Sequence, residues 1–354
     1  MSMALSGRRI LSEKLLALRQ VTSEAVTDVF LRRHPEWLEK YGPSARIRGI
    51  EDAGFHIDFL ASAIESGSTS SFEDYSRWTI SLLTSRNIAS HFVAENFKQI
   101  EDSLSFNLGE TEQEVIKEFI ATGILVCGEE PPVILDPEPH TPLAETQSLY
   151  LGAILKGQRP AAANIALEAL RQGHSVADIY ADVLQESLYE VGRKWATNQI
   201  TVAEEHMATA ITQYTISQLY ARSKPAGIRR GNLVITGVHH EMHQIGANMV
   251  ADVLESDGWD VRFLGTNVPH TGILQAIADH KADVLGISAT MLFNLPHAIK
   301  LVKEVRDRMK EHSPRIVLGG SAFRSVPELW REIGADGFSS DVRGAKALLQ
   351  KLSI

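Results

Sequence analysis

The second half of the chain alternates five short apolar runs with five amphipathic stretches, and this alternation restricts the possible folds more than any other feature. The apolar runs are predicted strands at residues 233–235, 261–264, 284–288, 315–318 and 337–338. The stretches with helical spacing are residues 247–255, 271–280, 295–310, 326–333 and 342–352. Strands that alternate with helices are typical of a doubly wound parallel sheet. We therefore predict a flavodoxin-like five-stranded parallel sheet covered by helices.

The first predicted strand runs into a polar loop that contains a candidate ligand pair. The loop carries His239, His240, Glu241 and His243, and it ends at Gly246. Ligands of open α/β sheets bind beyond the carboxyl ends of the strands, which is where this loop lies. A carboxylate two residues before a histidine can hold one ring N–H and leave the other ring nitrogen for a metal. Two alternatives stay open here: a solvated loop, and a zinc site formed by His239, His240 and His243.

Small and hydroxyl-bearing residues follow the third and fourth predicted strands. Ser288 and Thr290 come at the end of the third strand, and Gly319 and Gly320 at the end of the fourth. Such residues leave a slot at the sheet edge and line it with hydrogen-bond donors, which suits a long polar ligand. Taken singly, each also has an ordinary explanation, because Ser and Thr cap helices and Gly-Gly forms turns.

Taken in order, these strand-end residues resemble the cobalamin-binding domain, and the resemblance covers residues 230–354. That family carries Asp-x-His-x-x-Gly after its first strand, Ser-x-Thr or Ser-x-Leu after its third, and Gly-Gly after its fourth. The matching residues here are Glu241, His243, Gly246, Ser288, Thr290, Gly319 and Gly320.

The resemblance implies a bound cobalamin with His243 as the lower axial ligand of its cobalt. It also implies that the nucleotide tail of cobalamin enters the slot at the ends of the third and fourth strands. One departure is Glu241, which stands where the family has Asp. Because Glu is one methylene longer, the hydrogen bond between the carboxylate and His243 is open to rearrangement.

Residues 143–222 are predicted to form a four-helix bundle. Helical periodicity covers residues 143–155, 160–172, 176–195 and 202–221. Thr201 and Glu204 form a capping-box pattern before the fourth helix, and Ser175 is a candidate N-cap of the third. Four helices joined by short loops are typical of a bundle. A bundle placed before a cobalamin-binding sheet resembles the cap of methionine synthase and corrinoid carriers, which implies a helical cover over the upper cobalt face.

A second motif of the bundle is similar to one found in light-sensing cobalamin regulators. Their cap carries Trp, nine intervening residues and then Glu-His, and here Trp195 is followed at that spacing by Glu205 and His206. The resemblance implies that Trp195 packs on an upper adenosyl group, that Glu205 binds its ribose, and that His206 contacts Glu205 or the corrin. In those regulators a cobalt-binding His follows the Trp; here Ala196 follows it, so His206 or no group would take that role. The alternative is a core Trp beside a Glu that the helix dipole favours.

Residues 1–125 are predicted to form an all-helical sensor or dimerisation domain. Helical periodicity covers residues 10–32, 45–66, 71–103 and 111–121, and Thr111 with Glu114 forms a capping-box pattern in the last of these. The region distantly resembles helical sensor modules of bacterial signalling proteins. Two alternatives stay open: a domain that holds a bilin such as biliverdin, and an interaction bundle. The residues available to a pigment are His34, His56, Arg77, Arg86 and His91.

Residues 126–142 are predicted to form a semi-rigid linker, because they contain five prolines and four acidic residues. Cys127 lies at the start of this segment. An inert thiol is the favoured interpretation of Cys127, and a thioether to a bilin is the alternative.

The overall composition indicates a soluble protein of two or three domains. The net charge of −9 over 354 residues argues against a general nucleic-acid surface. A single cysteine allows no intrachain disulfide, which fits a reducing cytoplasm. No apolar run approaches 18 residues and the start lacks a signal-peptide pattern, so we expect a cytoplasmic protein without a membrane segment.

These features lead to two hypotheses for function. The first is a light sensor that binds adenosylcobalamin, in which photolysis of the cobalt–carbon bond changes domain or oligomer contacts. A bilin near the N-terminal helices would be a second chromophore of such a sensor. The second is a corrinoid protein that carries methyl groups between methyltransferases. In both cases we expect a protein partner, and a homo-oligomer, and in neither case catalysis by this chain alone.

Overall fold

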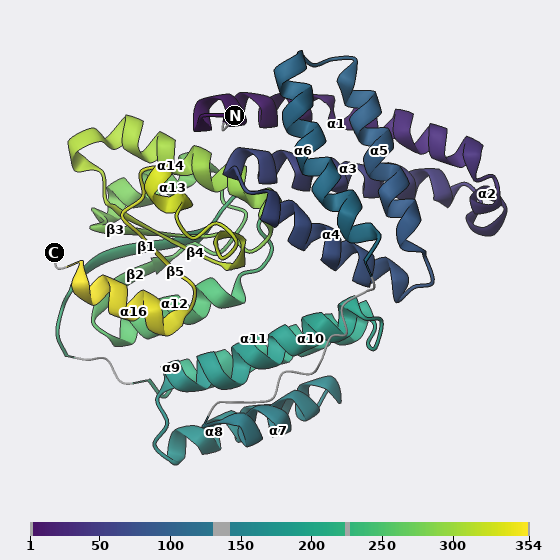
Figure 1. Cartoon of the computed structure of the whole chain (residues 1–354). Coiled ribbons are helices and arrows are strands. Elements are labelled where there is room, and N and C mark those ends of the chain that lie inside the picture. The colour runs from purple at the N-terminus through teal and green to yellow at the C-terminus, as the bar shows by residue number, and fades with distance from the viewer. Residues whose placement is uncertain (1–2, 130–141, 224–226, 353–354) are drawn as a thin grey trace. The chain divides into compact units, whose positions relative to one another are not determined.

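The computed structural model describes residues 3–129, 142–223 and 227–352, and it divides into two compact units, Met1–Val133 and Ile134–Ile354 (Figure 1). Most of the predicted linker, residues 130–141, lies outside the described residues. Its first two residues, Val126 and Cys127, belong to the last helix of the first unit. Within the described ranges, no helix is both long and apolar enough to span a bilayer.

The described part of the first unit is all-helical, as predicted. Its helices are α1 (Leu5–Arg33), α2 (Glu36–Tyr41), α3 (Ser44–Ser66), α4 (Thr69–Thr84), α5 (Ser90–Ser105) and α6 (Glu110–Cys127). The single helix predicted over residues 71–103 is wrong, because the chain turns between α4 and α5, where Asn87 adopts a φ of 61°. Asn tolerates this left-handed conformation better than most residues. The predicted capping box is also misplaced: α6 is capped at Gly109, whose N–H donates to Glu112.

Helix α3 forms the centre of the first unit. Its residues Ile57, Leu60 and Ile64 are completely buried. Ion pairs join α3 to α1 in antiparallel order, since Arg19 of α1 pairs with Asp58 and Arg46 of α3 pairs with Asp28. A helix buried on nearly all sides requires small residues at its contacts, here Ala61, Ser62 and Ala63.

The second unit begins with the predicted bundle. Its helical segments are α7 (Ala144–Leu155), α8 (Arg159–Arg171), α9 (Val176–Asp178), η1 (Ile179–Gln185), α10 (Glu186–Ala196) and α11 (Val202–Tyr220). The predicted third helix is continuous through α9, η1 and α10, but its middle part η1 is π-helical. The capping box before α11 is confirmed, because Thr201 Oγ1 accepts from the Glu204 N–H and Glu204 accepts from the Thr201 N–H.

The predicted sheet follows the bundle. Its elements are β1 (Gly231–Gly237), α12 (Ile245–Ser256), β2 (Trp259–Phe263), α13 (His270–His280), β3 (Val284–Ser288), η2 (Leu292–Asn294), α14 (Leu295–Met309), η3 (Lys310–His312), β4 (Arg315–Gly319), η4 (Ser321–Phe323), α15 (Leu329–Glu332), β5 (Gly337–Ser339) and α16 (Val342–Lys351). All pairings are parallel, and the strand order is β2-β1-β3-β4-β5. The predicted doubly wound fold is confirmed. The strand order reverses at the β1–β3 pair, which is where such sheets bind ligands.

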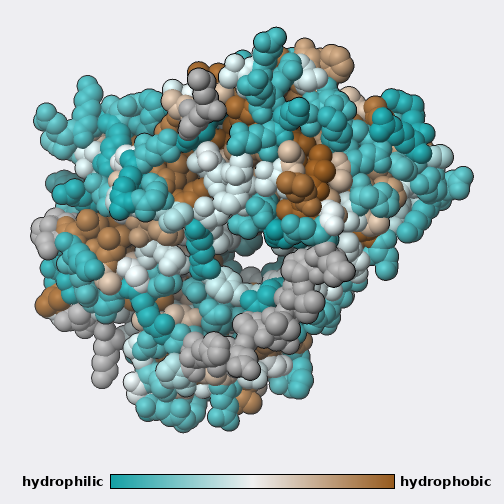
Figure 2. Space-filling view, viewed as in Figure 1, coloured by the Kyte–Doolittle hydropathy of each residue, from teal (hydrophilic) through white to brown (hydrophobic). Residues whose placement is uncertain are grey.

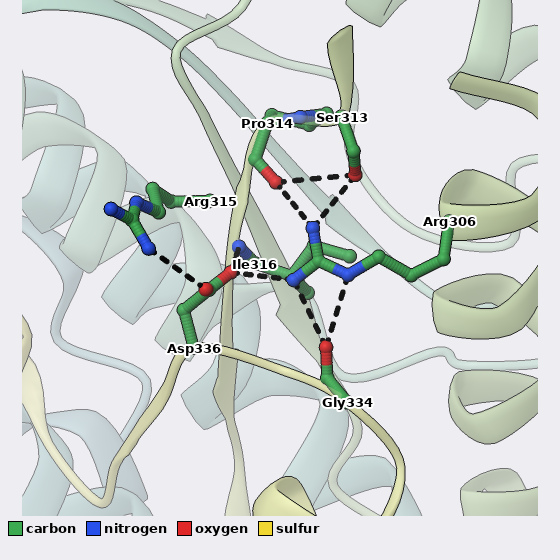
Figure 3. A network of polar contacts seen from close by, with 7 residues as sticks. All are labelled: Arg306, Ser313, Pro314, Arg315, Ile316, Gly334 and Asp336. Carbon is green, nitrogen blue, oxygen red and sulfur yellow. Dashed lines mark hydrogen bonds and ion pairs between the residues drawn. The ribbon is translucent and has the colours of Figure 1, made fainter. Parts of the chain in front are cut away.

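At the amino ends of the strands, one aspartate connects a helix to two strands (Figure 3). Asp336, just before β5, accepts from the Ile316 N–H of β4 at 2.7 Å and from Arg306 of α14 at 2.6 Å. Arg315 approaches the same carboxylate at 3.2 Å. Burial alone would raise the pKa of Asp336, but these donors outweigh it and lower the pKa. The network fixes the amino ends of β4 and β5, away from the strand ends that carry the motifs.

Within the second unit, the bundle and the sheet share a hydrophobic core. Tyr180 of the bundle, Met249 and Val253 of α12 and Val342 of α16 are all buried in it. Tyr180 also donates a hydrogen bond to Asp252 at 2.8 Å. The bundle therefore packs directly on the helix that follows the histidine loop. On the visible face of the molecule, hydrophilic residues dominate and apolar patches interrupt them, as on most water-exposed protein surfaces (Figure 2).

Candidate cofactor site

The loop after β1 holds His243 against a buried carboxylate. Glu241 is fully buried, and its Oε1 lies 2.7 Å from Nδ1 of His243. Because a carboxylate only accepts, Nδ1 carries the proton, and in the neutral imidazole Nε2 is left with a lone pair. The His243 side chain is 56% exposed, so this nitrogen is accessible to a ligand. Glu241 is therefore not a solvated loop residue, whereas the His243 ring remains exposed.

The extra methylene of Glu241 does not break the expected hydrogen bond. Instead, it lets the second oxygen, Oε2, reach the loop after β3. There it accepts from the Thr290 N–H at 2.6 Å and from Nδ2 of Asn294 at 3.0 Å. The carboxylate thus joins the ends of two neighbouring strands and leaves the His243 ring correctly oriented.

Asn294 is a site residue that the sequence reasoning missed. It is fully buried in η2, and within the described chain its Oδ1 has no hydrogen-bond partner, so it serves the site as a donor. In the sequence, Asn294 could have been recognised as the one polar residue in an apolar run, where it follows Leu292 and Phe293 and precedes Leu295. A buried amide in such surroundings requires a polar partner, here Glu241.

Each member of the pair shifts the pKa of the other toward its charged form. Burial tends to raise the pKa of Glu241, but the donors from His243 and Thr290 outweigh burial and lower the pKa to about 2. The hydrogen bond to Glu241 raises the pKa of His243, and the charge of Glu205 acts in the same direction. Glu241 therefore stays ionised and makes the imidazole more electron-rich, as outer-shell carboxylates do for metal ligands.

The other strand-end residues gather beside this pair. Gly237, Ser288 and Gly319 are in register across β1, β3 and β4. Gly320 has a φ of 99°, and a Cβ on it would lie 2.1 Å from the Ala289 carbonyl oxygen. Only glycine permits this close approach of the β3 and β4 ends. Thr290 follows in the same loop and, as described above, its N–H binds Glu241.

Open space lies next to the histidine. Gly246 is exposed in the first turn of α12, and a Cβ built on it would meet no atom within 4 Å. An accessible Nε2, open space above the first turn of α12 and glycines at the β4 end together fit the shape and chemistry of cobalamin. The residues present are therefore compatible with the cofactor that the sequence resemblance implies.

The bundle brings its own motif to the same part of the second unit. Trp195 is half-buried near the end of α10, and Glu205 and His206 lie in the first turn of α11. Glu205 Oε2 lies 2.6 Å from Nδ1 of His206, and its Oε1 accepts from Thr209 at 3.1 Å. Met207, which follows His206, and Ile245, at the start of α12, both pack against the same hydrophobic core.

The zinc alternative for the histidine loop is wrong. His243 is oriented by Glu241, whereas the rings of His239 and His240 lie 3.9 Å apart and near His297. Among the described residues, no three His, Cys, Asp or Glu side chains are arranged to hold a metal ion. Burial, reinforced by the neighbouring histidines, lowers the pKa of His297 to about 4.

In the first unit, the residues proposed for a pigment have protein partners. The pairs are His34 with Glu95, His56 with Tyr75, Arg77 with Glu73, Arg86 with the Leu82 carbonyl, and His91 tilted against the Phe92 ring. Cys127 is buried, and burial raises the pKa of its thiol to about 11. These contacts are those of a structural bundle and an unreactive thiol.

Comparison with known proteins defines the class of the second unit. Residues 231–345 match the family model of the B12 binding domain, and residues 148–220 match a second B12 binding domain model. The second unit is thus a pair of B12-binding domains, one helical and one built on the parallel sheet. The first unit lies outside both matched ranges.

The individual relatives are corrinoid proteins. A corrinoid protein of Desulfitobacterium hafniense is 22% identical over 205 residues, which cover 56% of this chain and 94% of the relative. Dimethylamine corrinoid protein 3 of Methanosarcina acetivorans is 29% identical over 188 residues, covering 49% of this chain and 84% of the relative. The monomethylamine corrinoid protein of Methanosarcina barkeri has the same fold, with a TM-score of 0.53 at 21% identity over 59% of this chain and 99% of that one.

Methionine synthase of Mycobacterium leprae is also similar, at 25% identity over 162 residues that cover 44% of this chain but only 13% of that enzyme. These relatives match the methyl-carrier hypothesis better than the light sensor. The adenosyl group and the bilin receive no support from them.

Proposed function

We propose that this chain is a corrinoid carrier that presents a cobalt-bound methyl group to a methyltransferase partner. The proposal rests on one observation, the exposed His243 ring held by the buried Glu241 carboxylate. The names of the corrinoid relatives, two of them amine corrinoid proteins, support the same class of function.

Cobalamin, when bound, supplies a cobalt atom that forms and breaks a weak bond to carbon. His243 would hold the cobalt through the Nε2 lone pair. Glu241 holds the Nδ1 proton, and Thr290 and Asn294 keep this carboxylate ionised and in place. The slot between the ends of β3 and β4 would receive the nucleotide tail, beside Ser288, Gly319 and Gly320.

On the upper side, the bundle would exclude water from the cofactor. Trp195 offers a flat apolar surface, and Glu205 offers a carboxylate held by Thr209. A methyltransferase partner must then gain access by moving the bundle, whose contacts with the sheet include the polar pair Tyr180–Asp252.

Electron paramagnetic resonance of the cobalt(II) protein tests the lower ligand. In unlabelled protein, a nitrogen ligand of either origin splits each cobalt line into three. If ¹⁵N-histidine labelling changes these triplets to doublets, the ligand is a protein histidine. The same labelled protein with His243→Ala is expected to lose the doublets, while His239→Ala is expected to keep them. Triplets that persist in the labelled protein would show that the ligand belongs to the cofactor, and would contradict the assignment of His243.

A light sensor is the second candidate, and one specific observation favours it: the spacing of Trp195, Glu205 and His206. Its test is size-exclusion chromatography of protein loaded with adenosylcobalamin in the dark and after illumination, with and without biliverdin. A light-dependent change of oligomeric state would favour the sensor. Methylation of the bound corrinoid by a methyltransferase, without any light-dependent change of assembly, would favour the carrier.

A further inference from the structure

Three imidazole rings, here called the histidine cluster, join the loop after β1 to helix α14. His239 and His240 belong to the loop, and their ring centroids lie 3.9 Å apart. His297 of α14 completes the cluster, with its ring centroid 5.8 Å from that of His239 and 5.2 Å from that of His240. The candidate site described above uses none of these three rings.

The backbone at His240 has a conformation that favours glycine. The Glu241 N–H donates to the Val238 carbonyl at 3.1 Å and closes a four-residue turn, in which His240 is the third residue and has a φ of 64°. Turns with a positive φ at this position usually carry Gly or Asn there. The His240 N–H donates to Oδ1 of Asn267 at 2.9 Å, and its ring contacts the other two rings of the cluster. A histidine persists in this conformation only where its surroundings hold it.

The histidine cluster connects the same two segments as a hydrogen bond of the ligand pair. Glu241 directly follows His240, and Asn294, which donates to Glu241 at 3.0 Å, stands three positions before His297. The ring contacts and this hydrogen bond are therefore two attachments between the loop after β1 and the segment that begins α14. Loss of the ring contacts would loosen Glu241 and, through Glu241, the ring of His243.

A proton on the cluster would meet like charges. The groups that act on His297 are burial, the two loop histidines, His270 of α13 and Lys300 of its own helix, and together they lower its pKa to about 4. The carboxylate of Glu304 lies 3.2 Å from Nδ1 of His270. Within the described chain, Nδ1 of His239 is buried without a hydrogen-bond partner. Because the folded state binds this proton less well than the unfolded state does, the stability present above pH 6.5 is lost as the pH falls toward 4.

We propose that the histidine cluster positions Glu241 and His243 while it is neutral, and releases them when His297 takes up a proton. The chain would then hold its corrinoid through histidine at neutral pH and lose this ligand in acid. The inference rests on the proposed corrinoid binding and adds a regulation of the same site. His297 is a positioning residue, because it acts on the ligand histidine only through Glu241 and its loop.

The test uses the full-length protein labelled with ¹⁵N-histidine, loaded with hydroxocobalamin and reduced to cobalt(II). Electron paramagnetic resonance between pH 8 and pH 5 gives the ratio of cobalt with histidine doublets to cobalt without them. Between pH 7 and pH 5.5 this ratio should fall about tenfold more in the wild type than in His297→Gln, because release returns the pKa of His297 from about 4 to its ordinary value of 6.5. Glutamine keeps a polar side chain but takes up no proton. Titration of His243 itself is common to both proteins and cancels in the comparison.

Two further variants accompany this comparison. His312→Gln removes an exposed histidine from η3, which follows α14, and should keep the pH dependence of the wild type. His240→Gly removes one ring of the cluster and suits the left-handed φ of the turn, so it should fold. Its pH dependence should be weaker than that of the wild type, in the same direction as His297→Gln.

The outcomes separate this inference from the function on which it rests. If the wild type retains no corrinoid in gel filtration, the proposed function itself is wrong. If it shows histidine doublets at pH 7, but these fall equally with pH in the wild type, His297→Gln and His240→Gly, only the role of the histidine cluster is overturned.

Discussion

At the scale of single residues, Glu241 determines the candidate site, because it receives hydrogen bonds from two loops. It binds its own loop through His243 and the loop after β3 through Thr290 and Asn294. The sequence motif revealed Glu241 and His243, since their spacing is local. Asn294 is 53 positions away, and only the parallel pairing of β1 with β3 brings it to the carboxylate.

Asn294→Ala is expected to destabilise the second unit by about 1–3 kcal/mol, because the buried Glu241 carboxylate loses a donor. The corrinoid affinity should fall as well, since the His243 ring is held less firmly. Urea unfolding and a titration with hydroxocobalamin measure the two effects. Asn294→Asp should be more harmful, because it places a second carboxyl group beside Glu241. Unchanged stability and affinity in the Ala variant would show that Asn294 does not hold Glu241.

The two adjacent glycines after β4 are expected to respond differently to alanine. Gly320→Ala should cost about 1–3 kcal/mol, because it combines a left-handed φ with a clash against the Ala289 carbonyl. Gly319→Ala should leave stability nearly unchanged, since its Cβ would lie 3.6 Å from the nearest neighbouring atom, the Ser339 carbonyl oxygen. The Gly319 variant should nonetheless bind hydroxocobalamin more weakly if the nucleotide tail occupies the slot. Thermal unfolding and cofactor titration of both variants give the comparison.

At the scale of elements, the strands and helices of the sheet were predictable because strands buried between helices have continuous apolar runs. Two features of the helices were not. The break between α4 and α5 depends on Asn87 in a left-handed conformation, which leaves the apolar spacing around it unchanged. The π-helical part of the third bundle helix has no signal in the apolar spacing, and it contacts α12 through Tyr180–Asp252 and α16 through Asp182–Arg343.

Helix α3 contains a histidine, His56, whose protonation opposes folding of the first unit. This side chain is buried, and burial lowers its pKa from 6.5 to about 4. The folded state therefore binds the proton less well than the unfolded state does, and the stability present above pH 6.5 is lost as the pH falls toward 4.

Hydrogen exchange of peptides from residues 44–66 checks this prediction. After correction for intrinsic rates, protection in the wild type should decrease between pH 7 and pH 5 relative to His56→Gln, which keeps a partner for the Tyr75 hydroxyl. Burial raises the pKa of Asp52 to about 6 and that of Glu65 to about 7, and these two carboxyls act in the opposite direction equally in both proteins. Equal pH dependence in both proteins would contradict a role for His56.

At the scale of the whole molecule, every residue assigned to the cofactor lies in the second unit. A fragment of residues 142–354 is therefore expected to bind hydroxocobalamin with the affinity of the full chain. Parallel titrations of both proteins, followed by absorbance, measure this directly. If the fragment binds hydroxocobalamin much more weakly, the first unit contributes to binding, although it lies outside both matched B12-binding ranges.

The π-helical segment η1 also sets the rotational phase of the third bundle helix. Tyr180 and Tyr189 both reach the sheet domain, through Asp252 and Arg324 respectively. Residues nine positions apart in a regular α-helix point in directions about 180° apart, because each residue turns the helix by about 100°. One extra residue taken up in a π-turn reduces this separation to about 80°. Deleting a single residue from η1 would therefore let the segment become regular α-helix with the two tyrosines still about 80° apart, since eight regular steps give the same angle. Forcing η1 into regular α-helix at its present length would instead turn one of the two tyrosines away from the sheet.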